Sequence, residues 1–176
     1  MDNQERDWFG DILISPEIVL LDLEAESDME AIDILAHHLY SKGIVKESYL
    51  PAVKQREVDF CTGLAFKTMG VALPHTDSIH VNQQAVAIGI LKHPVAFHAM
   101  GMPEETVDVS MMFMLAIQKP DAEIAFLGKM IEVLQEDGCL EMLKFAPTPE
   151  DVARIFRVFF GEDASGHVVF KDETVL

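Results

Sequence analysis

Hydrophobic and polar positions along the chain follow two different periods, which separate helices from strands. Over 27–42, apolar residues recur every three or four positions, as expected for one buried helical face. Ser27 and Glu30 form a capping-box pattern at its start, and Gly43 follows as a stop. The apolar face contains Met29, Ile32, Leu35, Ala36 and Leu39. The spacing therefore predicts a helix over 27–42.

Three further helices are predicted from their patterns and boundary residues. The segment 47–57 reads as a helix, and a second one spans about 121–138. The expected apolar face of the second contains Ile124, Leu127, Ile131 and Leu134. Thr148 and Pro149 start a last helix with a strong N-cap, and Gly161 ends it.

Between the helices, apolar residues run almost without interruption, as in strands that are covered on both faces. The segments 71–73, 85–91 and 107–117 have this pattern, and Pro74 halts the first of them. Strands that alternate with helices predict an α/β fold, in which a central mixed or mostly parallel sheet is flanked by helices.

The length of 176 residues fits one domain. We expect its core over about 17–160, with tails at 1–16 and 161–176. The amino-terminal residues carry charges and lack an apolar core, so no signal peptide is expected, and no apolar run reaches the roughly 18 residues of a spanning helix. Two cysteines are too few for a disulfide framework. These features predict a cytoplasmic protein without direct membrane insertion.

The net charge of −17 comes from 30 acidic and 13 basic residues. Such a chain repels a phosphate backbone and has no basic stripe to release counterions, which excludes nucleic acid as a direct partner. Anionic membrane surfaces are disfavoured for the same reason. A protein with a basic docking surface would be steered toward it.

One histidine stands out because of its position. His75 follows the strand 71–73 directly, behind the Pro74 that ends the strand. This places the imidazole at a sheet edge on a rigid backbone, and a neutral imidazole is a competent nucleophile near pH 7. From these residues alone, a surface or structurally satisfied histidine is the more common interpretation.

The segment Val71-Ala72-Leu73-Pro74-His75 resembles the active-site stretch of enzyme IIA domains of the bacterial phosphoenolpyruvate-dependent sugar phosphotransferase system, mannitol/fructose type. An Arg-Glu pair, Arg56-Glu57, precedes it as in the family. The spacing to His75 and the Phe60-x-Thr62-Gly63 ending are most similar to the galactitol-specific branch. The resemblance covers roughly residues 17 to 160.

This resemblance implies a phosphoryl carrier that needs no cofactor. His75 would accept phosphate from the phosphocarrier protein HPr and pass it to a cysteine of a cognate enzyme IIB, for galactitol uptake. Arg56 would bind phosphate oxygens with both arms of its guanidinium. Alternatively, Arg56 is a solvated helix residue that pairs with an acid. Thr62 would either bond the phosphate or cap a turn. His80 would orient its loop or His75.

Two alternatives stay open. A regulatory phosphohistidine module of the nitrogen-type IIA kind shares this fold and would signal to another protein instead of feeding transport. The second alternative is a relative of the fold that has lost phosphorylation. His75, Asp77 and His80 also suggest metal ligands, but they lack a standard zinc spacing, so we expect no metal site.

The chain departs from the family pattern at two positions. Thr76 replaces the usual small residue after the active histidine, and Glu123 stands where many members have a second active-site histidine. An ionised Glu123 close to His75 would repel phosphate. Glu123 must therefore point away from His75, be protonated, or stay outside its immediate surroundings. We favour the last, with Glu123 acting as a first-turn acid that is well placed against the helix dipole.

Overall fold

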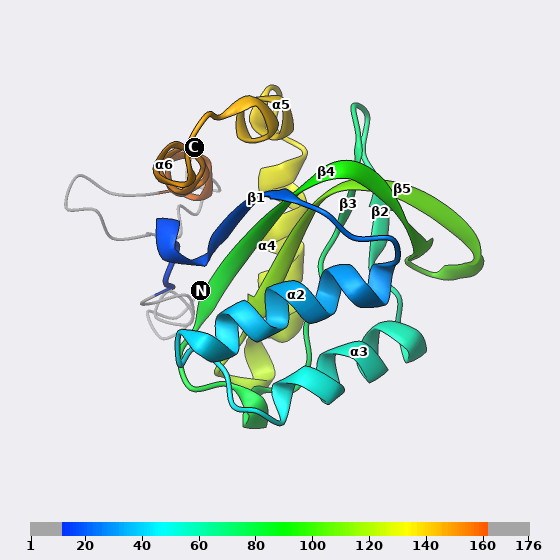
Figure 1. The fold of residues 1–176 in the computed structure, drawn as a ribbon, viewed down its shortest axis with the longest axis vertical. Coiled ribbons are helices and arrows are strands. Elements are labelled where there is room, and N and C mark those ends of the chain that lie inside the picture. Colours follow the sequence, from blue (N-terminus) through cyan, green and yellow to red (C-terminus); the bar gives the residue numbers. More distant parts are fainter. Residues whose placement is uncertain (1–11, 162–176) are drawn as a thin grey trace, which may run out of the picture.

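The computed structural model describes residues 12–161 as a mixed sheet between two layers of helices (Figure 1). The strands are β1 (Val19–Leu23), β2 (Gly63–Ala65), β3 (Gly70–Ala72), β4 (Ala85–Ala99) and β5 (Met102–Ala116). The α-helices are α2 (Asp28–Ser41), α3 (Tyr49–Asp59), α4 (Glu123–Leu134), α5 (Cys139–Phe145) and α6 (Pro149–Phe160). Short 3₁₀ turns are η2 (Pro16–Ile18), η3 (Ser78–His80) and η4 (Pro120–Ala122).

The sheet is built around the long antiparallel hairpin of β4 and β5. β1 lies parallel to β4, and β3 lies parallel to β5, while β2 and β3 are antiparallel to each other. β2 also meets β4 where Gly63 pairs with Ala99, so β4, β2, β3 and β5 form a closed cycle of pairings. The expected α/β fold with a central mixed sheet is confirmed.

Both faces of the sheet are covered, which explains the uninterrupted apolar segments. On β5, Phe113 and Leu115 point into a core with α4, α5 and α6, whereas Met112 and Met114 point toward α2 and α3. Figure 1 shows α2 and α3 together on one side of the sheet and α4 behind it. A strand buried on both faces has no reason to alternate apolar with polar residues.

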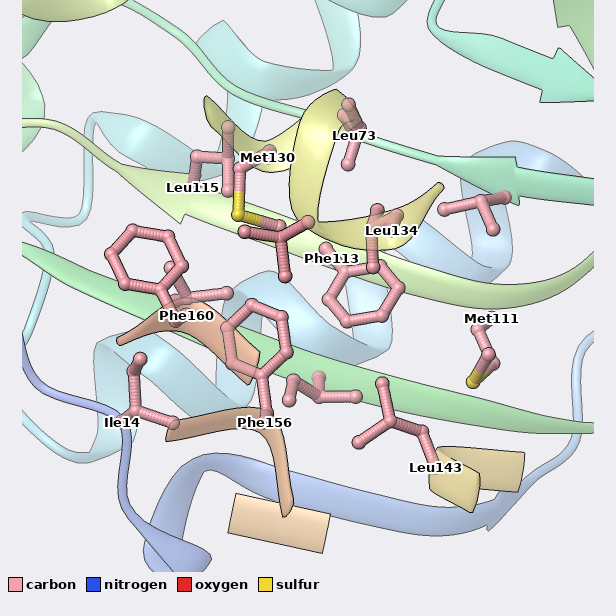
Figure 2. Packing of buried hydrophobic residues seen from close by; sticks show 14 of the residues in the cluster. Ile14, Leu73, Met111, Phe113, Leu115, Met130, Leu134, Leu143, Phe156 and Phe160 are labelled. Atoms are coloured by element: carbon pink, nitrogen blue, oxygen red, sulfur yellow. The ribbon is translucent and has the colours of Figure 1, made fainter. Parts of the chain in front are cut away.

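Aromatic rings join α6 to the sheet. The ring centroids of Phe113 and Phe156 lie 5.5 Å apart, and those of Phe156 and Phe160 lie 5.8 Å apart. Figure 2 shows these three rings packed together, with Met130 and Leu134 of α4 beside them. This side of the sheet therefore has a continuous core that holds α4 in place.

Two predicted helix starts are confirmed, one with a difference in detail. The Ser27 hydroxyl accepts the amide of Glu30 at 3.1 Å, as expected, but the Glu30 carboxylate accepts the amide of Glu26 rather than that of the cap residue. At α6, Thr148 accepts the amide of Asp151 at 3.1 Å.

The hairpin strands extend well beyond the predicted segments. The turn at Gly101, with φ of 77°, joins two strands of 15 residues each. His93 and His98, on either side of Pro94, lie within β4. The proline is accommodated where the pairing with β5 is irregular, between Ile90 and Val95.

The apolar face predicted for the helix after β5 is wrong in part. Ile124 is 86% exposed, and the buried positions of α4 include Phe126, Met130 and Val133. Apolar residues occur on both flanks of this helix, and the ring of Phe126 packs near that of Phe160, with centroids 6.1 Å apart. The flank that carries Phe126 therefore faces the core.

The chain termini fall partly outside the structure. Residues 162–176, where a tail was expected, lie outside the described residues. Residues 12–16 were also placed in a tail, but Ile12 and Ile14 are buried in the core beside β4. The strands β1 and β2 and the helix α5 were not predicted.

Candidate functional site

The imidazole of His75 is held at the end of β3. Pro74 ends the strand, and its carbonyl accepts the amide of Leu115 on β5 at 2.9 Å. The ring of His75 is 5% exposed, and its Nδ1 lies 2.8 Å from the carbonyl oxygen of Leu73. Because a carbonyl can only accept, Nδ1 carries the hydrogen. The lone pair of the neutral ring is therefore on Nε2.

Nε2 faces the first residue of α4. It lies 3.0 Å from Oε1 of Glu123, and the same oxygen lies 3.0 Å from Nη2 of Arg56. Neither an imidazole lone pair nor a carboxylate can donate a hydrogen bond, so a proton lies between Nε2 and Oε1. The expectation that Glu123 stays outside the surroundings of His75 is wrong.

Arg56 reaches this position from the last turn of α3. At the other end of the helix, the buried hydroxyl of Tyr49 donates to the carbonyl of Leu115 at 2.8 Å, which ties α3 to the strand beside His75. The guanidinium lies 4.8 Å above the ring of Phe60, and its Nη1 is 3.8 Å from Asp77. Its Nε is buried without a hydrogen-bond partner within residues 12–161.

Three chemical functions thus meet around one nitrogen. A secluded imidazole supplies a nucleophile, Arg56 supplies a positive fork suited to an anion, and Glu123 supplies an oxygen that can take a proton. The side chains of Arg56 and Glu123 are 30% and 25% exposed, so this edge of the site is open to solvent. The arrangement can accept an anionic electrophile at Nε2.

Thr62 lies behind His75 and not in front of it. Its hydroxyl donates to the carboxylate of Glu57, at 2.9 Å from Oε2, and its oxygen accepts the amide of Leu73 at 3.1 Å. The single hydroxyl hydrogen is therefore already used, and the contacts favour support of the chain before Pro74 over a bond to a bound anion.

Glu57 was not singled out from the sequence. It lies directly after Arg56 on α3 and is 3% exposed. Burial raises the pKa of Glu57 to about 7, although hydrogen bonds from Thr62 act in the opposite direction. The Arg56-Glu57 pair was the sequence feature that could have pointed to Glu57. Only the arginine of that pair has an obvious role in phosphate chemistry.

None of the other histidines within residues 12–161 bonds the ring of His75. His80 contacts the Ser48 hydroxyl at 2.8 Å, before the start of α3, so it orients its own loop. His98 donates from Nδ1 to the carbonyl of Pro103 at 2.8 Å. Within residues 12–161, no group of three or more His, Cys, Asp or Glu side chains is placed to hold a metal ion.

Comparisons with known proteins agree on one family. The family model described as "Phosphoenolpyruvate-dependent sugar phosphotransferase system, EIIA 2" matches residues 12–158. Among curated proteins, the galactitol-specific EIIA component of Escherichia coli K12 is 25% identical over 67% of this chain and 78% of its own length. The mannitol-specific enzyme IIA component of Staphylococcus aureus is 27% identical over 82% of this chain and 94% of its own length.

A transcriptional regulator from Bacillus subtilis, ManR, is 33% identical over 61% of this chain, and the match spans only 15% of that regulator. Among solved structures, the complex of mannitol enzyme IIA with phosphorylated enzyme IIB from E. coli has a TM-score of 0.65, at 18% identity over 80% of this chain and 94% of that one. The nitrogen regulatory protein IIA-Ntr from Neisseria meningitidis has a TM-score of 0.62, at 23% identity over 82% and 95%. Both likenesses concern the fold. No helix within residues 12–161 is long and apolar enough to cross a membrane.

Proposed function

This chain belongs to the phosphoenolpyruvate-dependent sugar phosphotransferase system EIIA 2 family, and we propose that it carries a phosphoryl group on Nε2 of His75 between two partner proteins. One observation carries the proposal. Nε2 of a nearly buried imidazole lies 3.0 Å from Oε1 of Glu123, and the guanidinium of Arg56 lies 3.0 Å from the same oxygen. An ordinary buried histidine has no need of both groups.

The transfer step follows from these contacts. The phosphorus–nitrogen bond to the donor breaks while a new bond forms from the Nε2 lone pair of His75, and the proton between Nε2 and Oε1 stays on Glu123. The protonated acid is neutral and no longer repels the incoming phosphoryl group. Arg56, released from its ion pair, is then free to bond phosphoryl oxygens as a fork. In delivery, the phosphorus–nitrogen bond to His75 breaks while a phosphorus–sulfur bond forms to the thiolate of the acceptor cysteine, and the lone pair returns to Nε2.

The proposed donor is HPr, and the proposed acceptor is a cysteine of a cognate enzyme IIB. Exposed apolar side chains occur on the three segments that carry Arg56, His75 and Glu123, and proteins use such side chains to bind other proteins. Phe60 is 65% exposed, Ile79 is 68% exposed and Ile124 is 86% exposed. A carrier that met only small molecules would have little use for them.

Galactitol uptake is the transport role that we favour. The galactitol-specific relative, the spacing from Arg56 to His75 and the glutamate at position 123 support it. The alternative is a regulatory phosphohistidine module that signals to another protein. The similarity to part of ManR favours that alternative. In both roles the phosphoryl group rests on His75.

A reconstituted relay tests the proposal. The protein is incubated with phosphoenolpyruvate, enzyme I and HPr, and intact mass is expected to rise by one phosphoryl group. Phosphorylated protein is then mixed with galactitol-, mannitol- and fructose-type IIB proteins, and we expect the galactitol type to be phosphorylated fastest. Equal or faster transfer to another type contradicts the galactitol assignment alone. No gain of mass with HPr contradicts the carrier role.

Glu123→Gln is expected to slow phosphorylation of His75 by roughly tenfold, the effect of about 1.4 kcal/mol. The amide cannot hold a proton as the acid does, and its own NH₂ can donate to the Nε2 lone pair and block it. Glu123→His keeps a proton acceptor and is expected to stay closer to wild type. Single-turnover rates with phosphorylated HPr measure both.

Glu132→Gln serves as the matched control because Glu132 is an exposed acid on the same helix. It is expected to leave the rate unchanged. A Glu123→Gln protein that is phosphorylated as fast as wild type would remove Glu123 from the transfer step.

A further inference from the structure

We propose that Glu57 is a positioning residue, which aims the ring of His75 through Thr62 and Leu73; this deepens the carrier function proposed above and rests on it. Glu57 touches neither His75 nor the space in front of Nε2. It acts through a chain of hydrogen bonds that ends on the opposite nitrogen of the ring.

The first link joins Glu57 to Thr62. Oε1 accepts the amide of Thr62 at 2.9 Å, and the Thr62 hydroxyl donates to the carboxylate at 2.9 Å from Oε2 and 3.1 Å from Oε1. A hydroxyl has one hydrogen and two lone pairs. The carboxylate, as the stronger acceptor, holds that hydrogen on its own side. The lone pairs of Thr62 are thereby turned away from Glu57.

The second link joins Thr62 to the end of β3. The amide of Leu73 donates to the Thr62 oxygen at 3.1 Å. The ladder of β3 ends at Ala72, and Leu73 is fully buried, so its amide would otherwise be an unpaired buried donor. Thr62 therefore fixes the peptide between Ala72 and Leu73, which adjoins the Leu73 carbonyl.

The third link joins Leu73 to His75. The carbonyl of Leu73 accepts the Nδ1 hydrogen of His75 at 2.8 Å, which selects the tautomer with its lone pair on Nε2. A shift or rotation of the Leu73 carbonyl weakens this bond. The ring is then free to tilt or to change tautomer, and both changes turn the nucleophile away from Arg56 and Glu123.

The surroundings of Glu57 do not explain why an acid is buried there. Within residues 12–161, the carboxylate of Glu57 forms no ion pair, and all of its hydrogen bonds are with Thr62. It faces Asp28 of α2, whose charge raises its pKa, and His98 of β4, whose charge lowers it. These residues line a cavity of about 300 Å³ with Cys61, Val58 and Met29. A buried carboxylate without a counter-ion is unfavourable for folding, so a task in positioning His75 accounts for its presence.

The test replaces Glu57 by Gln and follows His75 in two ways. Nitrogen-15 NMR of the imidazole reports the tautomer in unphosphorylated protein, and single-turnover transfer from phosphorylated HPr reports the rate. In wild type we expect the hydrogen on Nδ1. In Glu57→Gln we expect a mixture of tautomers and a rate about tenfold lower at saturating HPr, with an unchanged concentration for half-maximal rate.

Thr62 supplies a second, independent pair of variants. Thr62→Val keeps the shape but removes the hydroxyl, and it is expected to mix the tautomers and slow transfer as Glu57→Gln does. Thr62→Ser keeps the hydroxyl and is expected to restore both readouts toward wild type. Asp59→Asn removes an exposed acid from the same helix and is the control for charge alone.

The outcomes separate the two proposals. If wild type takes no phosphate from HPr, the carrier function fails, while the NMR comparison still decides the role of Glu57. If Glu57→Gln folds and keeps both the wild-type tautomer and the wild-type rate, the positioning role is overturned. Should Glu57→Gln not fold, equal behaviour of Thr62→Val and Thr62→Ser in both readouts overturns it instead.

Discussion

Phosphorylation by HPr is expected to be lost completely when His75 is replaced by alanine. The other described histidines lack its surroundings: His80 bonds Ser48, and His98 bonds Pro103. Among the histidines that the structure describes, only His75 has its Nε2 beside the carboxylate that also holds Arg56. A substitute nucleophile would lack both charge stabilisation and orientation.

Intact mass after incubation with phosphoenolpyruvate, enzyme I and HPr measures the loss. The group on the wild-type protein is expected to be acid-labile and base-stable, as a phosphohistidine is. His37→Ala, at an exposed position on α2, is the matched control and is expected to keep wild-type phosphorylation. Circular dichroism and thermal unfolding check that His75→Ala is folded. A folded variant that still gains one phosphoryl group at the wild-type rate would refute the assignment of the nucleophile.

Arg56→Lys is expected to slow transfer by roughly 10²-fold or more, as the loss of a charge-stabilising donor often does. Lysine keeps the charge but offers one point of contact, whereas the guanidinium of Arg56 can bond two oxygens at once. Lysine also lacks the flat face that lies 4.8 Å above the Phe60 ring. The effect should appear in the single-turnover rate more than in the affinity for HPr.

Arg154→Lys is the control for this substitution. Arg154 pairs with Asp151 on α6, with a side chain that is 61% exposed, and the change there is expected to be silent. If Arg56→Lys is as fast as wild type, Arg56 is a surface residue whose ion pair with Glu123 has no part in transfer.

Much of the fold could be predicted because its signals are local. The cap at Ser27 and the N-cap at Thr148 mark helix starts through contacts only three residues apart. The length of β4 could not be predicted in the same way. Pro94 is an ordinary strand breaker, and only the irregular pairing with β5 allows the strand to continue past it. Whether a strand can contain a proline depends on its partner strand, and the residues around the proline do not reveal it.

The residues of the candidate site could likewise be predicted only in part. The motif before His75 and the arginine at position 56 are visible in sequence. The contact of Glu123 with His75 is not, because it depends on where α4 begins after η4 and on how α3 packs beside β5. Glu57 looks like any helix acid until the loop that follows α3 brings Thr62 back onto its carboxylate.

The buried carboxyl of Glu57 also sets how the thermodynamic stability of the folded chain varies with acidity. Its pKa is about 7 in the folded state and 4.5 when burial is absent. Between these values the folded chain keeps a proton that the unfolded chain has released, so the free energy of unfolding falls as pH rises through this window. A difference of this size corresponds to about 3 kcal/mol. The carboxyl of Glu57 therefore makes the native state more stable in mild acid than at neutral pH. Positioning the His75 ring with a buried acid lowers the stability of the fold at neutral pH.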